Sequence, residues 1–161
     1  MTREEKLGVG VIGCGDVSGT AARLIADADR ARVVCAMDVQ PDLAQRLARE
    51  LGCEWTASQE ELLSRKDVEA VYVAVPNHLH CPVAVACMRA GRHVLVEKPI
   101  AVTLEEADLM IAEAEKHQVI LAVTFFAPYT PAARAARDLV REGAIGEVIA
   151  IKIGFYVCKP E

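Results

Sequence analysis

The sequence predicts a doubly wound α/β fold, in which a parallel sheet lies between two layers of helices. Short segments that are apolar throughout, such as residues 71–75, alternate along the chain with amphipathic segments of helical period. Strands of this kind are buried on both faces, as those of parallel sheets are. A glycine-rich turn also follows the first apolar segment. With 161 residues, the chain has room for one such domain with a substantial core, but not for two of full size.

The first half of the chain begins with an apolar strand at residues 7–12, followed by a helix over about residues 17–29 and a strand at 33–37. Leucines four residues apart then form one face of a helix that a glycine closes. Ser58-Gln59-Glu60-Glu61 has the pattern of a capping box, so a short helix begins there. The leucines are Leu43, Leu47 and Leu51, and the glycine is Gly52.

The second half continues the alternation. A second capping box at Thr103 opens a helix that ends near His117, a histidine favoured by the negative end of the helix dipole. We expect Leu104, Ala107, Ile111 and Ala114 on the buried face of this helix. The other expected elements are strands at 71–75, 93–96 and 119–123, a helix from Pro82 to Ala90 ended by Gly91, and a helix from Pro131 to Arg141 ended near Gly143.

The last segment has the period of two that is typical of a strand with one apolar face. Its apolar positions run from Ile149 to Val157, and no later element covers them. We therefore expect one α/β domain over residues 1–146, followed over 147–161 by a strand that is separate from it and has the place of the first strand of a truncated second domain. An uncovered strand pairs readily with another chain, so the Ile149–Val157 strand predicts a homo-oligomer.

Composition excludes several classes of partner. The 18 basic and 23 acidic residues give a net charge of −5 without basic clusters, which disfavours nucleic acid. Apolar runs of about six residues are far below the ~18 that span a bilayer, so no membrane association is expected. The charged N-terminus shows no signal peptide, and we expect a cytoplasmic protein.

The six cysteines form no Cys-x-x-Cys pair and lie mostly in apolar segments. We interpret them as reduced thiols that act as small core residues. The alternative is a zinc site at His78, His80 and Cys81, but the remaining ligand pair is missing at any standard spacing. We therefore predict no metal.

The glycine-rich turn predicts a phosphate-binding site. Gly13 permits a tight turn, and Gly15 lets the backbone approach a pyrophosphate without a Cβ in the way. The amides of Asp16 and Val17 then open a helix and point at the anion. Ser18 occupies the third glycine position, where a small residue still allows helix–strand packing. The alternatives are a turn that binds nothing and a methyltransferase-type turn for S-adenosylmethionine.

Asp38 ends the second expected strand, twenty residues past Ser18. A carboxylate at this position accepts hydrogen bonds from the adenosine ribose hydroxyls and repels a 2′-phosphate. The next residues, Val39-Gln40-Pro41, contain no arginine to offset that repulsion. We therefore predict NAD as the cofactor, in preference to NADP.

Two further motifs leave the carboxyl ends of neighbouring strands. Pro76-Asn77-His78-Leu79-His80 follows one strand and Glu97-Lys98-Pro99 follows the next. Ligands of open α/β sheets bind at those ends, so both motifs are expected to line one crevice. Alone, the first is also typical of a helix-entry turn and the second of a solvated loop.

Together these elements make the sequence resemble the Gfo/Idh/MocA oxidoreductases, whose N-terminal domain is an NAD(P)-binding Rossmann fold. The resemblance rests on the glycine turn, Asp38, the two later motifs and Gly143-Ala144-Ile145-Gly146-Glu147-Val148, which looks like the junction into the second domain. It covers nearly the whole chain, and the ordered set is more specific than any single motif.

The resemblance implies roles for the later motifs. Lys98 is expected near the nicotinamide and a substrate hydroxyl, where it acts as the catalytic residue that orients the hydroxyl and stabilises alkoxide charge. Pro99 would fix the loop, and Glu97 would hold the loop or the ammonium group. The segment beside the ribose and nicotinamide would contain Pro76, Asn77 and His80, whereas His78 is placed at the surface.

The sequence departs from the family in two ways. Members are about twice as long, and they usually carry the general base, a histidine or tyrosine, in a second domain that is missing here. Apolar Phe126 and Pro128 stand where an Asn and an Arg are common. Two functions therefore remain: an NAD-dependent oxidoreductase that moves hydride between nicotinamide and a sugar or cyclitol hydroxyl, and a non-catalytic NAD(H)-binding module that acts as a sensor or partner subunit.

Overall fold

A computed structural model describes residues 6–154, apart from the side chain of Val17. The chain divides after Thr124 into two compact units. Within the described residues, no helix has the length and apolar character needed to cross a membrane.

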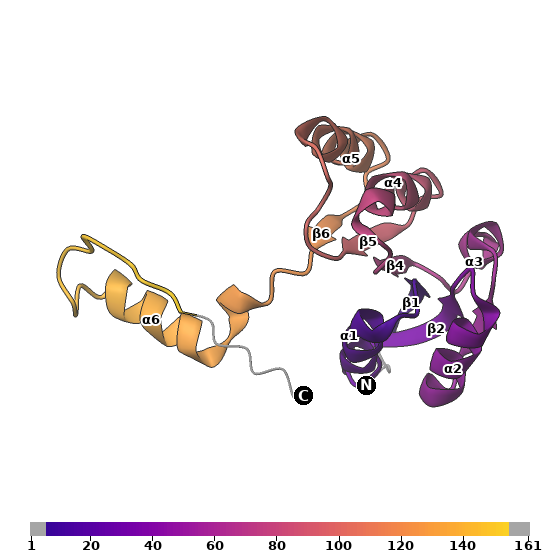
Figure 1. The fold of residues 1–161 in the computed structure, drawn as a ribbon, viewed down its shortest axis with the longest axis horizontal. Coiled ribbons are helices and arrows are strands. Elements are labelled where there is room, and N and C mark those ends of the chain that lie inside the picture. Colours follow the sequence, from indigo (N-terminus) through magenta and orange to yellow (C-terminus); the bar gives the residue numbers. More distant parts are fainter. Residues whose placement is uncertain (1–5, 155–161) are drawn as a thin grey trace, which may run out of the picture. The chain divides into compact units, whose positions relative to one another are not determined.

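The first unit is built on one sheet of six strands, all parallel, in the order β3-β2-β1-β4-β5-β6 (Figure 1). This arrangement confirms the predicted doubly wound sheet. The chain order reverses between β1 and β4, which creates a switch point where the loops after the two strands diverge. The strands are β1 (Leu7–Ile12), β2 (Ala31–Met37), β3 (Glu54–Thr56), β4 (Ala70–Val73), β5 (His93–Val96) and β6 (Leu121–Val123).

Several helices of this unit begin and end at capping residues. The hydroxyls of Ser58 and Thr103 accept hydrogen bonds from the N–H groups of Glu61 and Glu106, which confirms the N-cap of each predicted capping box. The reciprocal bond of the box is not formed, because the Glu61 carboxylate accepts from the Thr56 hydroxyl and the Glu106 carboxylate from the N–H of Val102. The αL conformation of Gly52 closes α2, as expected. The helical elements are α1 (Asp16–Ala26), α2 (Pro41–Leu51), α3 (Gln59–Ser64), η1 (Asn77–Leu79), α4 (His80–Arg89) and α5 (Leu104–Lys116).

The core consists of two apolar clusters, one on each face of the sheet. On β4, Tyr72 packs into the cluster that includes Ala22 of α1 and Leu47 of α2. Val71 and Val73 point the other way, into a cluster with residues of α4 and α5. Because successive side chains of a strand point to opposite faces, a strand covered on both sides must be apolar at every position.

Two sequence predictions for this unit need correction. The edge strand β3 was not expected, because its three residues carry no apolar run. On α5, Leu104 is 80% exposed and Ile111 is 47% exposed, whereas Met110 is fully buried. The buried stripe is therefore rotated from the predicted one, and it includes Glu113, which Arg89 of α4 holds through two hydrogen bonds of 2.9 and 3.0 Å.

The second unit contains η2 (Ala127–Tyr129) and α6 (Pro131–Arg141), the helix predicted from the sequence. The Thr130 hydroxyl caps α6 by accepting from the N–H of Ala133. The strand predicted over 147–157 is not formed in its described part, residues 147–154. A strand needs a neighbour for its N–H and C=O groups, and none of the described residues pairs with this segment. Residues 155–157 lie outside the described residues.

Candidate cofactor site

The predicted site residues gather at the carboxyl end of the sheet, around the switch point between β1 and β4. Two cavities open there, and both are bounded by Gly15 and Asp16 at the start of α1. We call them the α1–α2 cavity, of about 380 Å³, and the β4–β5 cavity, of about 250 Å³. The two cavities therefore meet at the glycine turn.

The glycine turn has the geometry that its sequence predicts. Gly13 has a φ of +91°, and a Cβ added there would lie 2.3 Å from the carbonyl oxygen of Ala74, so the position requires glycine. At Gly15, by contrast, a Cβ would meet no atom within 4 Å. The space beside Gly15 is therefore open to a ligand.

The start of α1 has no side-chain cap, because the residue before it is Gly15. The first N–H groups of a helix have no partner within the helix, and they favour an anion. Ser18 is fully buried, and its hydroxyl donates to the carbonyl oxygen of Gly15 at 2.7 Å. This bond fixes the turn against the helix, a contact that only a small side chain permits.

Asp38 follows β2 and reaches the same turn. One carboxylate oxygen accepts a hydrogen bond from the N–H of Cys14 at 2.8 Å, and the other accepts from the N–H of Gln40 at 2.9 Å. The sequence predicted a ribose-binding carboxylate at Asp38, but it did not predict its bond to the glycine turn. A contact between residues 24 positions apart depends on how β1 and β2 align, and spacing alone does not reveal it.

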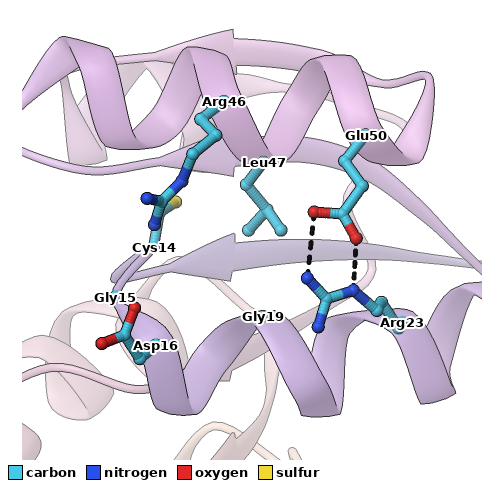
Figure 2. Close-up of a pocket in the computed structure, with 8 residues that line it drawn as sticks. All are labelled: Cys14, Gly15, Asp16, Gly19, Arg23, Arg46, Leu47 and Glu50. Atoms are coloured by element: carbon cyan, nitrogen blue, oxygen red, sulfur yellow. Dashed lines mark hydrogen bonds and ion pairs between the residues drawn. The ribbon is translucent and has the colours of Figure 1, made fainter.

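The α1–α2 cavity is closed on its far side by an ion pair between Arg23 of α1 and Glu50 of α2 (Figure 2). Arg46 of α2 also lines this cavity, and Figure 2 shows its guanidinium group beside Cys14. This arginine is not among the residues directly after Asp38, where a partner for a 2′-phosphate is expected from the sequence, so it was missed. The helical turn of α2 brings Arg46 back to the cavity from eight positions further along.

The β4–β5 cavity combines the residues of both later motifs. Residues from the loop after β4 face residues from the loop after β5 across the start of α1. The structure thus brings together eight of the predicted site residues: Gly15, Asp16, Ser18, Pro76, Asn77, His80, Glu97 and Lys98. His78, placed at the surface by the sequence argument, is exposed.

His80 ties the two loops of this cavity together. Its side chain is buried, with Nδ1 2.7 Å from the carbonyl oxygen of Pro99 and Nε2 3.0 Å from that of Val75. A neutral imidazole donates through one nitrogen only, whereas an imidazolium donates through both. Each ring nitrogen thus lies within hydrogen-bond distance of a backbone carbonyl group, one of them that of Pro99. His80 therefore forms part of the cavity wall.

Glu97 organises the residue beside it. One carboxylate oxygen accepts from the Tyr72 hydroxyl at 2.9 Å, and the other accepts from the backbone N–H of Lys98 at 3.2 Å. The Lys98 ammonium lies 3.8 Å from the same carboxylate. Burial, and after it the hydrogen bond to Glu97, raises the pKa of Tyr72. The phenol therefore stays protonated and acts as a donor.

Cys14 lies in the turn itself but is not a reactive thiol. Burial and the nearby Asp38 carboxylate raise its pKa to about 12, and its Sγ lies 3.3 Å from the carbonyl oxygen of Met37. The five described cysteines are all free. The part of the chain that the structure describes contains no group of three metal-ligating side chains arranged to hold an ion.

A parallel sheet in this order, with a glycine turn at the switch point and an acid after the second strand, defines a dinucleotide-binding Rossmann domain. The family model for the GFO_IDH_MocA oxidoreductases, described as an NAD-binding Rossmann fold, matches residues 7–125. The chain therefore belongs to the Gfo/Idh/MocA family, as its motifs indicate.

Characterised relatives are longer proteins that act on sugars. The chain is 40% identical over 129 residues to 1,5-anhydro-D-fructose reductase from Ensifer adhaerens, covering 80% of this chain and 39% of that protein. It is 33% identical over 143 residues to 2,7-anhydro-N-acetylneuraminate hydratase from Mediterraneibacter gnavus, covering 89% of this chain and 38% of that protein. The chain thus spans less than half the length of these relatives.

Solved structures of similar proteins contain either cofactor. A 3-ketoreductase from Actinomadura kijaniata in complex with NADP superposes with a TM-score of 0.83 at 33% identity, over 89% of this chain and 46% of that one. A protein of gentamicin A biosynthesis in complex with NAD gives a TM-score of 0.84 at 30% identity, over 89% and 41%. Members of this family therefore bind NAD or NADP.

Proposed function

We propose that this chain is the cofactor half of an NAD-dependent oxidoreductase that transfers hydride between nicotinamide and a hydroxyl-bearing carbon of a sugar or cyclitol. The observation that carries the proposal is the pair of cavities that meet at Gly15 and Asp16: one is lined by Cys14, whose N–H Asp38 binds, and the other by Lys98. A dinucleotide has two nucleoside halves joined by a pyrophosphate, and this arrangement offers a place for each part.

The residues present fit such a group. The uncapped start of α1 and the open space at Gly15 would hold the pyrophosphate through backbone N–H groups. The Asp38 oxygens each have a second lone pair, with which they would accept from the ribose hydroxyls while keeping the turn in place. Pro76, Asn77 and His80 would line the nicotinamide side.

The bound nicotinamide would supply the hydride acceptor or donor. Lys98 would handle the substrate oxygen, because it lines the β4–β5 cavity. An ammonium group orients a substrate hydroxyl by hydrogen bonding and stabilises negative charge that develops on its oxygen. Glu97 would keep this group near the cavity.

The preference for NAD is also part of the proposal. The Asp38 carboxylate would repel a 2′-phosphate, and the Arg46 guanidinium in the same region would attract it. Asp38 is held by two backbone N–H groups, whereas Arg46 is an exposed side chain with more freedom. We expect the fixed carboxylate to dominate, so that NAD binds more tightly.

The remaining parts of the protein follow from the length of its relatives. We propose that residues 1–146 form the cofactor domain and that residues 147–161 begin a second domain, which would supply the general base and much of the substrate pocket. The exposed apolar residues Ile149, Ile151 and Ile153 support burial of this segment against another domain or a second copy.

The test has two stages. Titration of NADH into the chain, followed by fluorescence, should show saturable binding; absence of binding at millimolar NADH would overturn the proposal. Reduction of NAD+ is then measured against a panel of sugars and cyclitols. Turnover that Lys98→Ala abolishes and Lys66→Ala, an exposed control, leaves intact supports the oxidoreductase. Tight NADH binding without turnover, in a form of the protein that includes the second domain, favours the non-catalytic module.

A further inference from the structure

A hydrogen-bond chain runs from the buried part of β4 to Lys98. It starts at the Tyr72 hydroxyl, passes through the Glu97 carboxylate and ends at the backbone N–H of Lys98, whose ammonium group forms an ion pair with the same carboxylate at 3.8 Å. We propose that Tyr72 is a positioning residue for Lys98, acting through Glu97. This inference rests on the proposed function, which gives Lys98 its role in handling the substrate oxygen.

The register of the sheet sets up this contact. Tyr72 of β4 lies opposite Leu95 of β5, and Glu97 lies two residues beyond Leu95. Residues two apart on a strand share a face, so the Glu97 side chain leaves β5 on the face that carries Tyr72. The N–H of Glu97 also donates to the carbonyl oxygen of Val73 at 2.9 Å, which continues the ladder to this residue.

Packing does not explain the hydroxyl of Tyr72. The ring is fully buried in an apolar cluster with residues such as Val9, Val11 and Ala36, where phenylalanine would fill the same space. A buried hydroxyl needs a partner, because leaving it unpaired costs its full desolvation. Its partner here is Glu97, whose side chain is only 13% exposed.

The two oxygens of Glu97 have divided roles. One is fixed by Tyr72 from within the sheet, and the other faces Lys98 at the cavity. A carboxylate held at one oxygen cannot rotate freely, so the direction of the second oxygen is set by the first. Without the Tyr72 hydroxyl, the carboxylate loses its fixed point, and Lys98 loses a defined acceptor.

The first experiment uses Tyr72→Phe in the full chain, with Tyr129→Phe as the matched control because Tyr129 is exposed. Amide hydrogen exchange is followed by NMR at Lys98 and at Val94, whose N–H donates to the Ile120 carbonyl within the core. We expect Tyr72→Phe to speed exchange at Lys98 about tenfold, as the loss of an anchored charge-assisted hydrogen bond implies, and to leave Val94 unchanged.

The second readout is the acylation rate of the Lys98 ammonium relative to that of Lys66, measured by mass spectrometry. Tyr72→Phe and Glu97→Gln should both raise this ratio, and the double variant should add little to either. Unchanged Lys98 exchange and acylation in Tyr72→Phe would overturn the inference. If Tyr72→Phe does not fold, Tyr72→Met, which also lacks the hydroxyl, decides in the same way.

NADH binding separates this inference from the proposed function. Tyr72 lines neither cavity, so Tyr72→Phe should retain NADH affinity while the fluorescence of bound NADH changes with the displaced ammonium group. Failure of the wild-type chain to bind NADH would overturn the proposed function and leave the Tyr72–Glu97–Lys98 coupling standing. Normal NADH binding with an unaltered Lys98 would overturn the coupling alone.

Discussion

The carboxylate of Asp38 accepts a hydrogen bond from the backbone N–H of Cys14, with 2.8 Å between oxygen and nitrogen. Cys14 lies between Gly13 and Gly15, so a side chain at the end of β2 fixes the middle of the glycine turn. An acid at this position would therefore serve the turn as well as the ribose. Its removal should affect the geometry of the turn and the choice of cofactor together.

We expect Asp38→Asn to lower NADH affinity about tenfold, equivalent to ~1.4 kcal/mol, and to raise NADPH affinity relative to NADH. The amide keeps an acceptor oxygen but loses the charge that favours ribose hydroxyls and repels a 2′-phosphate. Calorimetric titration with both cofactors measures the ratio. Asp42→Asn, a change in the exposed first turn of α2, is the control.

Arg46 provides a second check on the same ratio. In the Asp38→Asn background, Arg46→Ala should reverse part of the gain in NADPH affinity. Arg49→Ala, about one helical turn further along α2, should not. An unchanged NADPH-to-NADH ratio in all three variants would show that neither charge faces the 2′ position.

The turn should be intolerant of alanine at Gly13 for a steric reason. Gly91 also has a positive φ, of +74°, but a Cβ there would meet no atom within 4 Å. We expect Gly91→Ala to cost about 1–2 kcal/mol, the strain of the left-handed conformation alone. Gly13→Ala should cost about 1–3 kcal/mol more, because its Cβ would overlap the Ala74 carbonyl group. Urea unfolding measures both, and equal losses would contradict the clash.

Replacing His80 should loosen both loops of the β4–β5 cavity. His80→Leu removes the imidazole that lies within hydrogen-bond distance of the Val75 and Pro99 carbonyl groups, so at least one of them loses its buried donor, which we expect to cost about 1–3 kcal/mol of stability and to weaken NADH binding. His78→Leu, an exposed neighbour, should do neither. Thermal unfolding and NADH titration of the two variants make the comparison. A His80→Leu protein with wild-type stability would refute the clamp.

The ion cluster between α4 and α5 should make the free energy of unfolding depend on pH in the acidic range. Hydrogen bonds from Arg89, with help from Lys116 and His117, lower the pKa of Glu113 from 4.5 to about 2. A carboxyl group whose pKa is lower in the folded state stabilises the fold at pH values above its pKa in the unfolded state. This stabilisation is lost as the pH falls from about 4.5 towards 2.

Arg89→Ala should therefore be less stable than wild type at pH 7 and should lose less stability on acidification between these limits. Urea unfolding across this pH range tests the expectation, with Arg49→Ala as the control. Parallel pH profiles for wild type and Arg89→Ala would show that the cluster does not couple folding to protonation.

Much of the first unit was predictable, because its signals are local. Apolar runs mark strands that are buried on both faces, and the capping hydroxyls of Ser58 and Thr103 lie three residues from the N–H groups they cap. The glycine turn and both later motifs were also placed correctly at one crevice. They follow parallel strands, and the carboxyl ends of such strands lie at the same edge of the sheet.

The missed features depend on contacts between distant residues. The bond between Asp38 and Cys14, the bond between Tyr72 and Glu97 and the approach of Arg46 are set by strand register and helix packing. The buried face of α5 likewise depends on a distant contact, because α5 packs against α4. The period of two after Glu147 describes how side chains would alternate, but it cannot supply the neighbouring strand that pairing requires.

The shared border of the two cavities at Gly15 and Asp16 has a consequence for engineering the molecule. A Cβ at Gly15 would meet no atom of the protein within 4 Å, so a larger side chain there would extend into open space rather than into the core. Because Gly15 lines both cavities, one substitution would narrow both of them at once.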